Sequence, residues 1–274
     1  MKNLTAGLVL GAITVNLLFW IIPLVAIVVV QAVIRSDAVH RRCFTFVEWI
    51  YRRAVAIDSL LLKRVLGIEF IIHGDVPTDP TEQCIVVSNH RSWFDILVIQ
   101  ELITGQGPML KFLIKRELVY VPVVGWICLA LDFPRLTRGK GDDGRQRDFA
   151  SVAAAAAAIN ETPCALMNFA EGTRFTFAKR DASHSPYQHL LNPKTGGFRI
   201  MLDSLQASII DITLVYPIDE ISFWRCLSGE LKQIEVFIDR HPPITSNDAR
   251  MWLDARWKEK DERFEHSALR PGSA

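Results

Sequence analysis

A histidine and an aspartate lie five residues apart in the segment SNHRSWFD, residues 88–95, which directly follows a short apolar run. Residues five apart on a continuous helix point about 140° away from each other. We therefore expect a turn at His90 and a helix that places Asp95 in its first turn, so that the carboxylate reaches the imidazole. Such a pair forms an oriented general base, because the second ring nitrogen can accept a proton from a hydroxyl group. The alternative is a purely structural aspartate, since Ser92 and Asp95 also fit an S-x-x-D capping pattern at a helix N-terminus.

A charged turn follows a second apolar run later in the chain. Residues 165–169 are typical of a buried strand, and Glu171-Gly172-Thr173-Arg174 comes one residue later. In α/β sheets, the turns at the carboxyl ends of strands bind ligands. Gly172 would let the backbone approach a ligand closely, and Arg174 could hold a phosphate through two parallel hydrogen bonds. Taken alone, the same four residues would also suit a surface turn with an ion pair.

The elements that must position these residues follow from the apolar pattern. Short runs rich in Ile, Val and Phe predict strands, and longer stretches with helical spacing predict helices. The predicted strands are 68–72, 84–87, 165–169, 209–215 and 233–238, and the predicted helices are 93–103, 145–160, 197–205 and 247–264. This alternation predicts an α/β fold with a mostly parallel central sheet flanked by helices.

The excess of hydrophobic residues is concentrated at the N-terminus. The chain is 50% hydrophobic, and residues 6–34 contain no charged side chain. As a helix this run would be about 43 Å long, against about 30 Å for the hydrocarbon core of a membrane. It is too long for a signal peptide and has no small-residue cleavage site at its end. Pro23 divides the run, so it would form either a tilted membrane helix or a broken helix or helical pair.

A basic segment follows this run. Residues 35–66 combine helical spacing of apolar residues with seven basic and three acidic side chains. By the positive-inside rule, the rest of the chain is expected on the cytoplasmic side, at the inner membrane if the protein is bacterial. The segment would lie on anionic headgroups or pack on the following domain with its basic side in water. We therefore divide the chain into a membrane anchor (1–34), a basic amphipathic helical segment (35–66) and an α/β domain (67–274).

The composition and the remaining residues exclude other classes of function. The 31 basic and 30 acidic residues nearly cancel, so no overall charge favours nucleic acid. The five cysteines are scattered without C-x-x-C spacing, which indicates reduced thiols rather than a zinc site or a disulfide framework. No G-x-S-x-G motif of a serine hydrolase is present. Four further histidines have no carboxylate at a useful spacing and are interpreted as structural or surface residues: His73, His184, His189 and His241.

These two motifs and a later Tyr216-Pro217 pair, in this order, resemble those of the lysophospholipid acyltransferase family, the 1-acylglycerol-3-phosphate O-acyltransferases. Residues 89–95 match the family's N-H-x4-D block, and residues 169–174 match F-P-E-G-T-R with alanine in place of the proline. Tyr216-Pro217 matches a later, proline-centred block. The resemblance covers about residues 85–220.

The remaining block of the family ends in an arginine, and two residues of this chain compete for that position. Arg138 is preferred over Arg135, because Leu136-Thr137-Arg138 has the aliphatic-x-Arg ending. The stretches 175–179 and 191–197 are similar to those of a subgroup with a long segment after the F-P-E-G-T-R block.

The resemblance implies a membrane-bound O-acyltransferase that moves a fatty acyl group from acyl-CoA or acyl-acyl carrier protein to a lysophospholipid. Lysophosphatidic acid is the expected acceptor, and neither a metal nor a bound cofactor is required. His90 would be the general base and Asp95 its orienting partner, while backbone amides near Gly172 or Pro217 would bind the oxyanion. The expected phosphate-binding residues are Glu171, Gly172, Thr173 and Arg174, with Arg138 or Arg135. The alternatives are a related enzyme that acylates another lysophospholipid, glycerol-3-phosphate or an amino-acid lipid, and a non-catalytic lipid-binding protein.

Overall fold

The computed structural model describes residues 2–34, 36–112, 114–115, 163–219 and 221–267, the pair 135–136, and the single residues 120, 125, 131, 133 and 269. The described helices are α1 (Lys2–Val33), α2 (Asp37–Leu60), the π-helical turn η1 (Leu61–Val65), α3 (Phe94–Thr104), α6 (Phe177–Ala182), α7 (Thr195–Ser204), α8 (Phe223–Leu227), the 3-10 turn η3 (Ser246–Asp248) and α9 (Ala249–His266). The described strands are β1 (Glu69–His73), β2 (Cys84–Ser88), β3 (Leu110–Phe112), β4 (Ile114–Lys115), β5 (Arg135–Leu136), β6 (Ala165–Phe169), β7 (Ser208–Val215) and β8 (Gln233–His241).

Six of the strands form one sheet in the order β1-β8-β7-β2-β6-β3, while β4 and β5 pair separately. The neighbouring strands within the six-stranded sheet run parallel except β7 and β8, so the predicted mostly parallel sheet is confirmed. Strand β2 lies at the centre, where Cys84 is opposite Ser208 of β7 and Ala165 of β6. Because β7, β2 and β6 are parallel, their carboxyl ends meet at one edge of the sheet.

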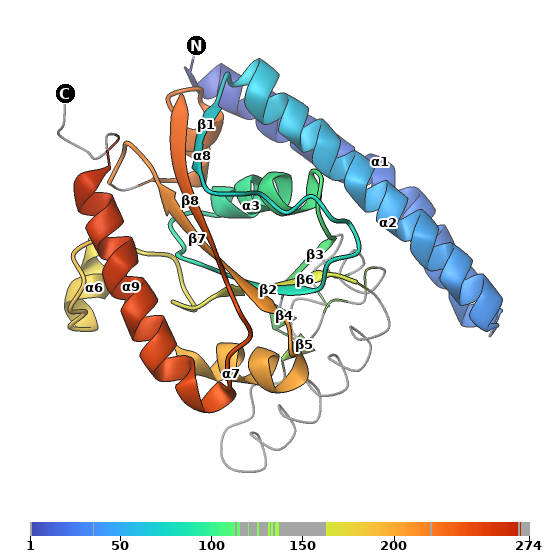
Figure 1. The fold of residues 1–274 in the computed structure, drawn as a ribbon. Coiled ribbons are helices and arrows are strands. Elements are labelled where there is room, and N and C mark those ends of the chain that lie inside the picture. Colours follow the sequence, from blue (N-terminus) through green and yellow to red (C-terminus); the bar gives the residue numbers. More distant parts are fainter. Residues whose placement is uncertain are drawn as a thin grey trace.

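Helices cover both faces of this sheet, as Figure 1 shows, with α3 and the N-terminal helices on one side and α7 and α9 on the other. Alternation along β2 accounts for this arrangement, since successive side chains of a strand point to opposite faces. Cys84 and Val86 belong to the apolar cluster with α3, whereas Ile85 and Val87 belong to the cluster with α7 and α9. The uninterrupted apolar run of β2 is therefore a strand that is buried on both faces.

Helices α1 and α2 form an antiparallel pair along one side of the sheet (Figure 1). The Nδ2 atom of Asn16 donates to Asp58 Oδ1 over 2.9 Å and to the Ala54 carbonyl over 3.0 Å, which joins the two helices by a polar contact. Helix α1 continues through Pro23 as a single element. The N-terminal apolar run therefore forms one helix, and α2 supplies the second helix of the pair.

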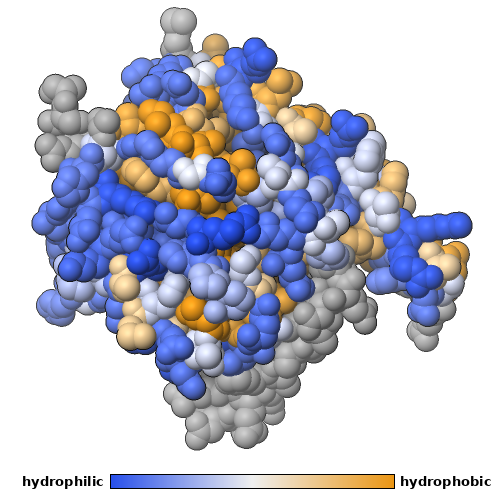
Figure 2. Space-filling model, in the orientation of Figure 1, coloured by the Kyte–Doolittle hydropathy of each residue, from blue (hydrophilic) through white to orange (hydrophobic). Residues whose placement is uncertain are grey.

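The surface of α1 is strongly apolar. An 18-residue stretch within Lys2–Gln31 has a mean hydropathy of 2.7, and 28% of that stretch is buried. Helix α1 is the one helix within the described residues that is long and apolar enough to cross a membrane. The face shown in Figure 2 is largely hydrophilic, with hydrophobic side chains visible in patches between the charged ones. On α2, the half-exposed rings of Phe46 and Trp49 stack on each other, and the Arg53 guanidinium lies 5.5 Å from the centroid of the Trp49 ring.

The predicted strands are observed with ends that differ by at most three residues, and three of the predicted helices are observed as α3, α7 and α9. The helical spacing in 35–66 corresponds to α2 and η1. The predicted helix 145–160 lies outside the described residues. Five short elements were not predicted, namely β3, β4, β5, α6 and α8, because elements of two to six residues carry too little periodic pattern.

Candidate active site

Three sequence motifs meet at the shared carboxyl edge of β7, β2 and β6. His90 follows β2, Glu171 follows β6, and Tyr216 directly follows β7. The Asn89 side chain joins two of these strand ends, because its Nδ2 donates to the Leu214 carbonyl over 3.0 Å and its Oδ1 accepts from the Leu214 amide over 2.9 Å. The side-chain amide thus continues the pairing of β2 with β7 one residue beyond the strand.

The centre of this edge is the pair of His90 and Asp95. The distance from His90 Nδ1 to Asp95 Oδ2 is 2.8 Å, the imidazole side chain is 11% exposed, and the carboxylate is completely buried. If Nδ1 carries the proton donated to Asp95, the basic lone pair of the neutral ring is on Nε2. The pair therefore has the arrangement of an oriented general base.

The turn that joins β2 to α3 also depends on Asp95. Its Oδ2 accepts from the backbone amides of Arg91 over 2.6 Å and Ser92 over 2.9 Å. The capping interpretation and the orienting interpretation therefore describe the same carboxylate, which holds the N-terminal turn of α3 and the His90 ring together. A carboxylate at this position also complements the positive end of the helix dipole.

Aromatic rings surround the imidazole. Phe169 stacks on His90 with ring centroids 4.0 Å apart and planes inclined by 18°, and Trp93 lies edge-on at 6.4 Å. The Arg174 guanidinium lies over the same Trp93 ring, 5.2 Å from its centroid. Trp93 therefore lies between the candidate base and the candidate phosphate-binding arginine.

Glu171 faces the protein interior. It is 1% exposed, and its two carboxylate oxygens accept from the backbone amides of His90 over 2.9 Å and Leu191 over 3.0 Å. Burial raises the pKa of Glu171 to about 8, although these two amides and the neighbouring Arg91 guanidinium favour its charged form. The carboxylate holds the backbone of the β2 turn and of the loop before α7.

The Gly172 turn has a geometry that requires glycine. Gly172 has φ +67°, and a Cβ atom there would meet the Lys194 side chain at 3.3 Å. Its amide donates to the Phe169 carbonyl over 2.9 Å. On the outer side of the turn, Lys179 Nζ donates to Thr173 Oγ1 over 3.0 Å and to the Arg174 carbonyl over 2.8 Å. The exposed Arg174 and Lys194 side chains thus flank one turn.

The other expected site residues are placed differently. Arg138 lies outside the described residues, and Arg135 is the first residue of β5, which pairs with β4 in the separate two-stranded sheet. Pro217 directly follows Tyr216 and has no N–H group to offer an oxyanion. The Gly172 amide is already used within its own turn. Gly172 and Pro217 therefore offer no free N–H group of their own, and the backbone amides near them stay predictions for the oxyanion site.

Sequence reasoning assigned no role to the side chains of three residues in this region. Tyr216 donates its hydroxyl to Asp95 Oδ1 over 2.6 Å, and Lys194 lies against Gly172. The buried Arg91 donates to the carbonyls of His189 over 2.8 Å and Asp219 over 2.7 Å. Each lies inside or beside a recognised motif, but only the folded chain shows its partner.

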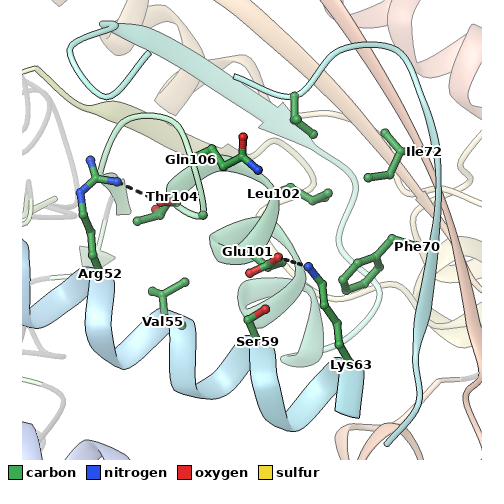
Figure 3. A pocket seen from close by; sticks show the side chains of 13 residues that line it. Arg52, Val55, Ser59, Lys63, Phe70, Ile72, Glu101, Leu102, Thr104 and Gln106 are labelled. Atoms are coloured by element: carbon green, nitrogen blue, oxygen red, sulfur yellow. Dashed lines mark hydrogen bonds and ion pairs between the residues drawn. The ribbon is translucent and has the colours of Figure 1, made fainter. Parts of the chain in front are cut away.

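A separate groove of about 380 Å³ lies at the other end of α3, between α2, β1 and the last turn of that helix (Figure 3). Its charged side chains are already paired, since Lys63 forms an ion pair with Glu101 and Arg52 donates to the Thr104 and Gly107 carbonyls. Asp95 lies in the first turn of α3 and not at this groove. The groove therefore shares a helix with the candidate active site but none of its residues.

One cluster under α9 contains groups that could bind a metal. Ligand atoms of Asp211, Asp239 and His241 lie within 4.8 Å of one another. Two cations of α9 lie at the same carboxylates, with Lys260 Nζ 2.7 Å from Asp211 and Arg263 2.7 Å from Asp239. The carboxylate charges are thus balanced by protein cations, and we assign this cluster to the packing of α9 on the sheet.

Comparison with known proteins identifies similar chains. The acyltransferase family model matches residues 69–218. Lysocardiolipin acyltransferase 1 of Mus musculus is 28% identical over 243 residues, and the match covers 79% of this chain and 63% of the relative. The 1-acyl-sn-glycerol-3-phosphate acyltransferase delta of Rattus norvegicus is 29% identical over 236 residues, and the match covers 78% of this chain and 61% of the relative. This chain therefore spans less than two thirds of the length of these curated relatives.

The fold is also similar to a solved structure. The crystal structure of the 1-acyl-sn-glycerophosphate (LPA) acyltransferase PlsC from Thermotoga maritima matches with a TM-score of 0.57 and 18% sequence identity. The match covers 97% of this chain and 99% of the solved chain. At this level of identity the likeness shows a shared fold, including the N-terminal helices.

Proposed function

This chain belongs to the acyltransferase family, whose model matches more than half of it, and on that premise we propose that it transfers a fatty acyl group to a lysophospholipid. The proposed acceptor is lysophosphatidic acid, and the donor is an acyl thioester, either acyl-CoA or acyl-acyl carrier protein. The curated relatives support this class of acceptor, since their names refer to lysocardiolipin and to 1-acyl-sn-glycerol-3-phosphate. A lysocardiolipin is accordingly the second acceptor to test.

The observation that carries the proposal is the His90–Asp95 pair at the edge of the sheet. In the proposed reaction, His90 Nε2 takes the proton of the acceptor hydroxyl group while that oxygen attacks the thioester carbonyl carbon. The tetrahedral intermediate then collapses, the carbon–sulfur bond breaks, and the imidazolium returns the proton to the leaving thiolate. Asp95 stabilises the imidazolium that forms between these steps. The products are an ester and a free thiol.

We assign recognition of the acceptor phosphate to the outer side of the Gly172 turn. Arg174 is held there by its contact with Trp93, and Lys194 adds a second cation beside Gly172. An arginine and a lysine are suited to a phosphate group, because both donate charge-assisted hydrogen bonds. Fixing the phosphate would orient the reacting hydroxyl group toward His90. Arg138 and Arg135 stay predictions for the same role.

Glu171 has a different role in this proposal from the one expected from its motif. Since both of its oxygens accept backbone amides inside the protein, we assign it to positioning rather than to contact with the phosphate. One oxygen holds the backbone of His90, and the other holds the loop that leads to Lys194. A substitution at Glu171 would therefore disturb both the general base and the phosphate site.

We further propose that the α1–α2 pair keeps the enzyme at the membrane in which its acceptor resides. The apolar exposed surface of α1 supports this proposal, as do the aromatic and basic side chains on α2. The positive-inside rule would place the basic side chains of α2 on the cytoplasmic side of the membrane. The catalytic domain would then face the cytoplasm. The lysophospholipid, the acyl thioester and the membrane are then the partners of this protein.

The direct test is an acceptor panel with the purified full chain in phospholipid vesicles. Each reaction would contain a radiolabelled acyl-CoA or acyl-acyl carrier protein and one acceptor: lysophosphatidic acid, lysocardiolipin, lysophosphatidylglycerol, glycerol-3-phosphate or an amino-acid lipid. We expect the largest kcat/KM for lysophosphatidic acid. A larger kcat/KM for another acceptor would move the assignment to that lipid, and no acylated product with any combination would overturn the proposed function.

A further inference from the structure

The buried carboxylate of Asp95 accepts four hydrogen bonds. Its Oδ2 accepts from His90 Nδ1 over 2.8 Å, from the Arg91 amide over 2.6 Å and from the Ser92 amide over 2.9 Å. Its Oδ1 accepts from the Tyr216 hydroxyl over 2.6 Å. The first three donors belong to the same turn as Asp95, whereas Tyr216 is 121 residues away in the sequence. The hydrogen bond from Tyr216 is therefore the one of these four that depends on the tertiary fold.

The surrounding structure holds Tyr216 in this position. The ring is 1% exposed and directly follows β7, and Pro217 ends the strand after it. The side chain of Asn89 ties the end of β2 to Leu214, two residues before Tyr216. Burial and the Asp95 charge raise the pKa of Tyr216 well above its ordinary value, so its hydroxyl stays protonated and donates. A distance of 2.6 Å between the oxygens is typical of a charge-assisted hydrogen bond.

We propose that Tyr216 is a positioning residue that orients the Asp95 carboxylate and sets how strongly Asp95 stabilises the charged His90 imidazole. Tyr216 orients the Asp95 carboxylate because its hydroxyl holds Oδ1. This contact fixes the rotation of the carboxylate that points Oδ2 at the imidazole. Tyr216 also affects the charge of the pair, since each hydrogen bond that a carboxylate accepts lowers the negative charge that the carboxylate offers to another partner. This proposal rests on the proposed function only where it uses His90 as the base.

Other charged or titratable groups also face this cluster from neighbouring elements: Arg91 after β2, Glu171 after β6, Arg174 beside Trp93, Asp219 after β7 and Cys226 in α8. All of them are retained in a protein that lacks only the Tyr216 hydroxyl. A comparison of Tyr216→Phe with the wild type therefore isolates the effect of that hydroxyl. Without it, Asp95 offers more charge to His90, and the imidazole holds its proton to a higher pH.

The chain contains a matched control. Tyr51 is also buried, and its hydroxyl is also hydrogen-bonded, donating to the Leu110 carbonyl over 3.0 Å and accepting from Gln100 Nε2 over 2.9 Å. It lies on α2 and does not contact Asp95. Tyr51→Phe therefore removes a buried hydroxyl of the same kind without touching the proposed pair.

The experiment follows His90 directly, without relying on catalysis. The full-length chain in vesicles would be treated with diethyl pyrocarbonate, which modifies neutral imidazole, and His90 modification would be measured by mass spectrometry between about pH 5 and 9. We expect Tyr216→Phe to move the midpoint upward by roughly half a pH unit or more. Tyr51→Phe should leave it unchanged, and Tyr216→Phe should have no further effect in an Asp95→Asn background. The same midpoint in Tyr216→Phe and wild type, or an equal shift in Tyr51→Phe, would overturn the proposal.

Two further measurements distinguish the positioning role of Tyr216 from a folding defect. They also test this role separately from the proposed function. Replacing Tyr216 with 3-fluorotyrosine keeps the contact but makes the hydroxyl a stronger donor, so the midpoint should move downward; an unchanged or higher midpoint counts against the proposal. This replacement also provides the test if Tyr216→Phe does not fold. In the acylation assay, Tyr216→Phe should lower kcat roughly tenfold with little change in the acceptor KM, because Asp95 without this anchor holds the His90 ring less firmly in the orientation for proton transfer. A wild-type chain that acylates no acceptor would overturn the proposed function, whereas the His90 midpoints would still decide the role of Tyr216.

Discussion

Two histidines of this protein bind a carboxylate in nearly the same way. The nitrogen-to-oxygen distance is 2.8 Å both in the pair of His90 with Asp95 and in the pair of His73 with Glu235. Each imidazole also stacks on a phenylalanine ring, with centroid distances of 4.0 Å for His90 and 4.6 Å for His73. The local contact alone therefore does not identify a general base.

The two pairs differ in their surroundings. His73 belongs to the edge strand β1, and its side chain is 48% exposed, against 11% for His90. His73 binds its carboxylate through Nε2, whereas His90 uses Nδ1. His90 also lies where three parallel strands end, beside a turn that presents Arg174. A histidine–carboxylate pair thus becomes a candidate base through burial and through its position among other functional residues.

Removal of each imidazole in turn tests whether the two pairs differ in function. We expect His90→Ala to lower kcat/KM for acyl transfer by roughly a thousandfold, because the acceptor hydroxyl loses its proton acceptor. His73→Ala should stay within about twofold of wild type, since an exposed pair of this kind contributes little. Initial rates in vesicles, with equal membrane fractions and equal melting temperatures, measure both effects. Near-normal turnover in His90→Ala would exclude it as the base.

The phosphate site beside His90 is a second difference between the two regions. We expect substitutions in this site to have smaller effects on acyl transfer than the loss of His90. Arg174→Ala should raise the KM for lysophosphatidic acid roughly tenfold, and Lys194→Ala somewhat less, because each removes one charge-assisted contact. The value of kcat should change little. Arg180→Ala is the control, since this arginine pairs with Asp181 on α6. An unchanged acceptor KM in both Arg174→Ala and Lys194→Ala would contradict the assigned site.

The smallest expected effect concerns Glu171 and the pH dependence of stability. Burial raises its pKa from 4.5 to about 8, so the folded protein binds this proton more tightly than the unfolded chain does. Its contribution is fully present below about pH 4.5 and is lost as the pH rises through about 8. We expect the melting temperature of Glu171→Gln, minus that of wild type, to become larger as the pH rises through this range, because glutamine cannot ionise.

Thermal unfolding of both proteins at a series of pH values measures this difference. Wild type and Glu171→Gln with parallel pH profiles would show that Glu171 does not titrate in this range. The same variant should lower kcat more than it raises the acceptor KM, as a positioning role requires. A rise in KM alone would instead return Glu171 to direct phosphate binding.

Most of the sheet could be predicted from the sequence because its strands are buried on both faces. The apolar runs of β2, β6 and β7 are nearly continuous, and turns with polar or proline residues mark their ends. The edge strand β3 and the short helices α6 and α8 lack such a pattern and were missed. The antiparallel pairing of β8 with β7 also depends on contacts between distant segments.

The same distinction applies to the site. The spacing of His90 and Asp95 across a strand-to-helix turn is local, so the sequence was sufficient to predict that the two could meet. The motif around Glu171 was also recognisable, but its residue types suited either a ligand or the interior. Only the packing of the loop before α7 shows that the carboxylate points inward, since Leu191 contributes an amide from twenty residues away.

The five longer strands, the apolar N-terminal run and the residues of the candidate base could be predicted from the sequence alone, because these depend on neighbours within a few positions. The tertiary structure alone decided which distant groups complete each contact: Tyr216 on Asp95, Glu235 on His73, and Lys194 beside Gly172. The physical reason lies in the order of the strands. Parallel pairing of β7, β2 and β6 brings three chain segments to one edge, and no local pattern specifies that order.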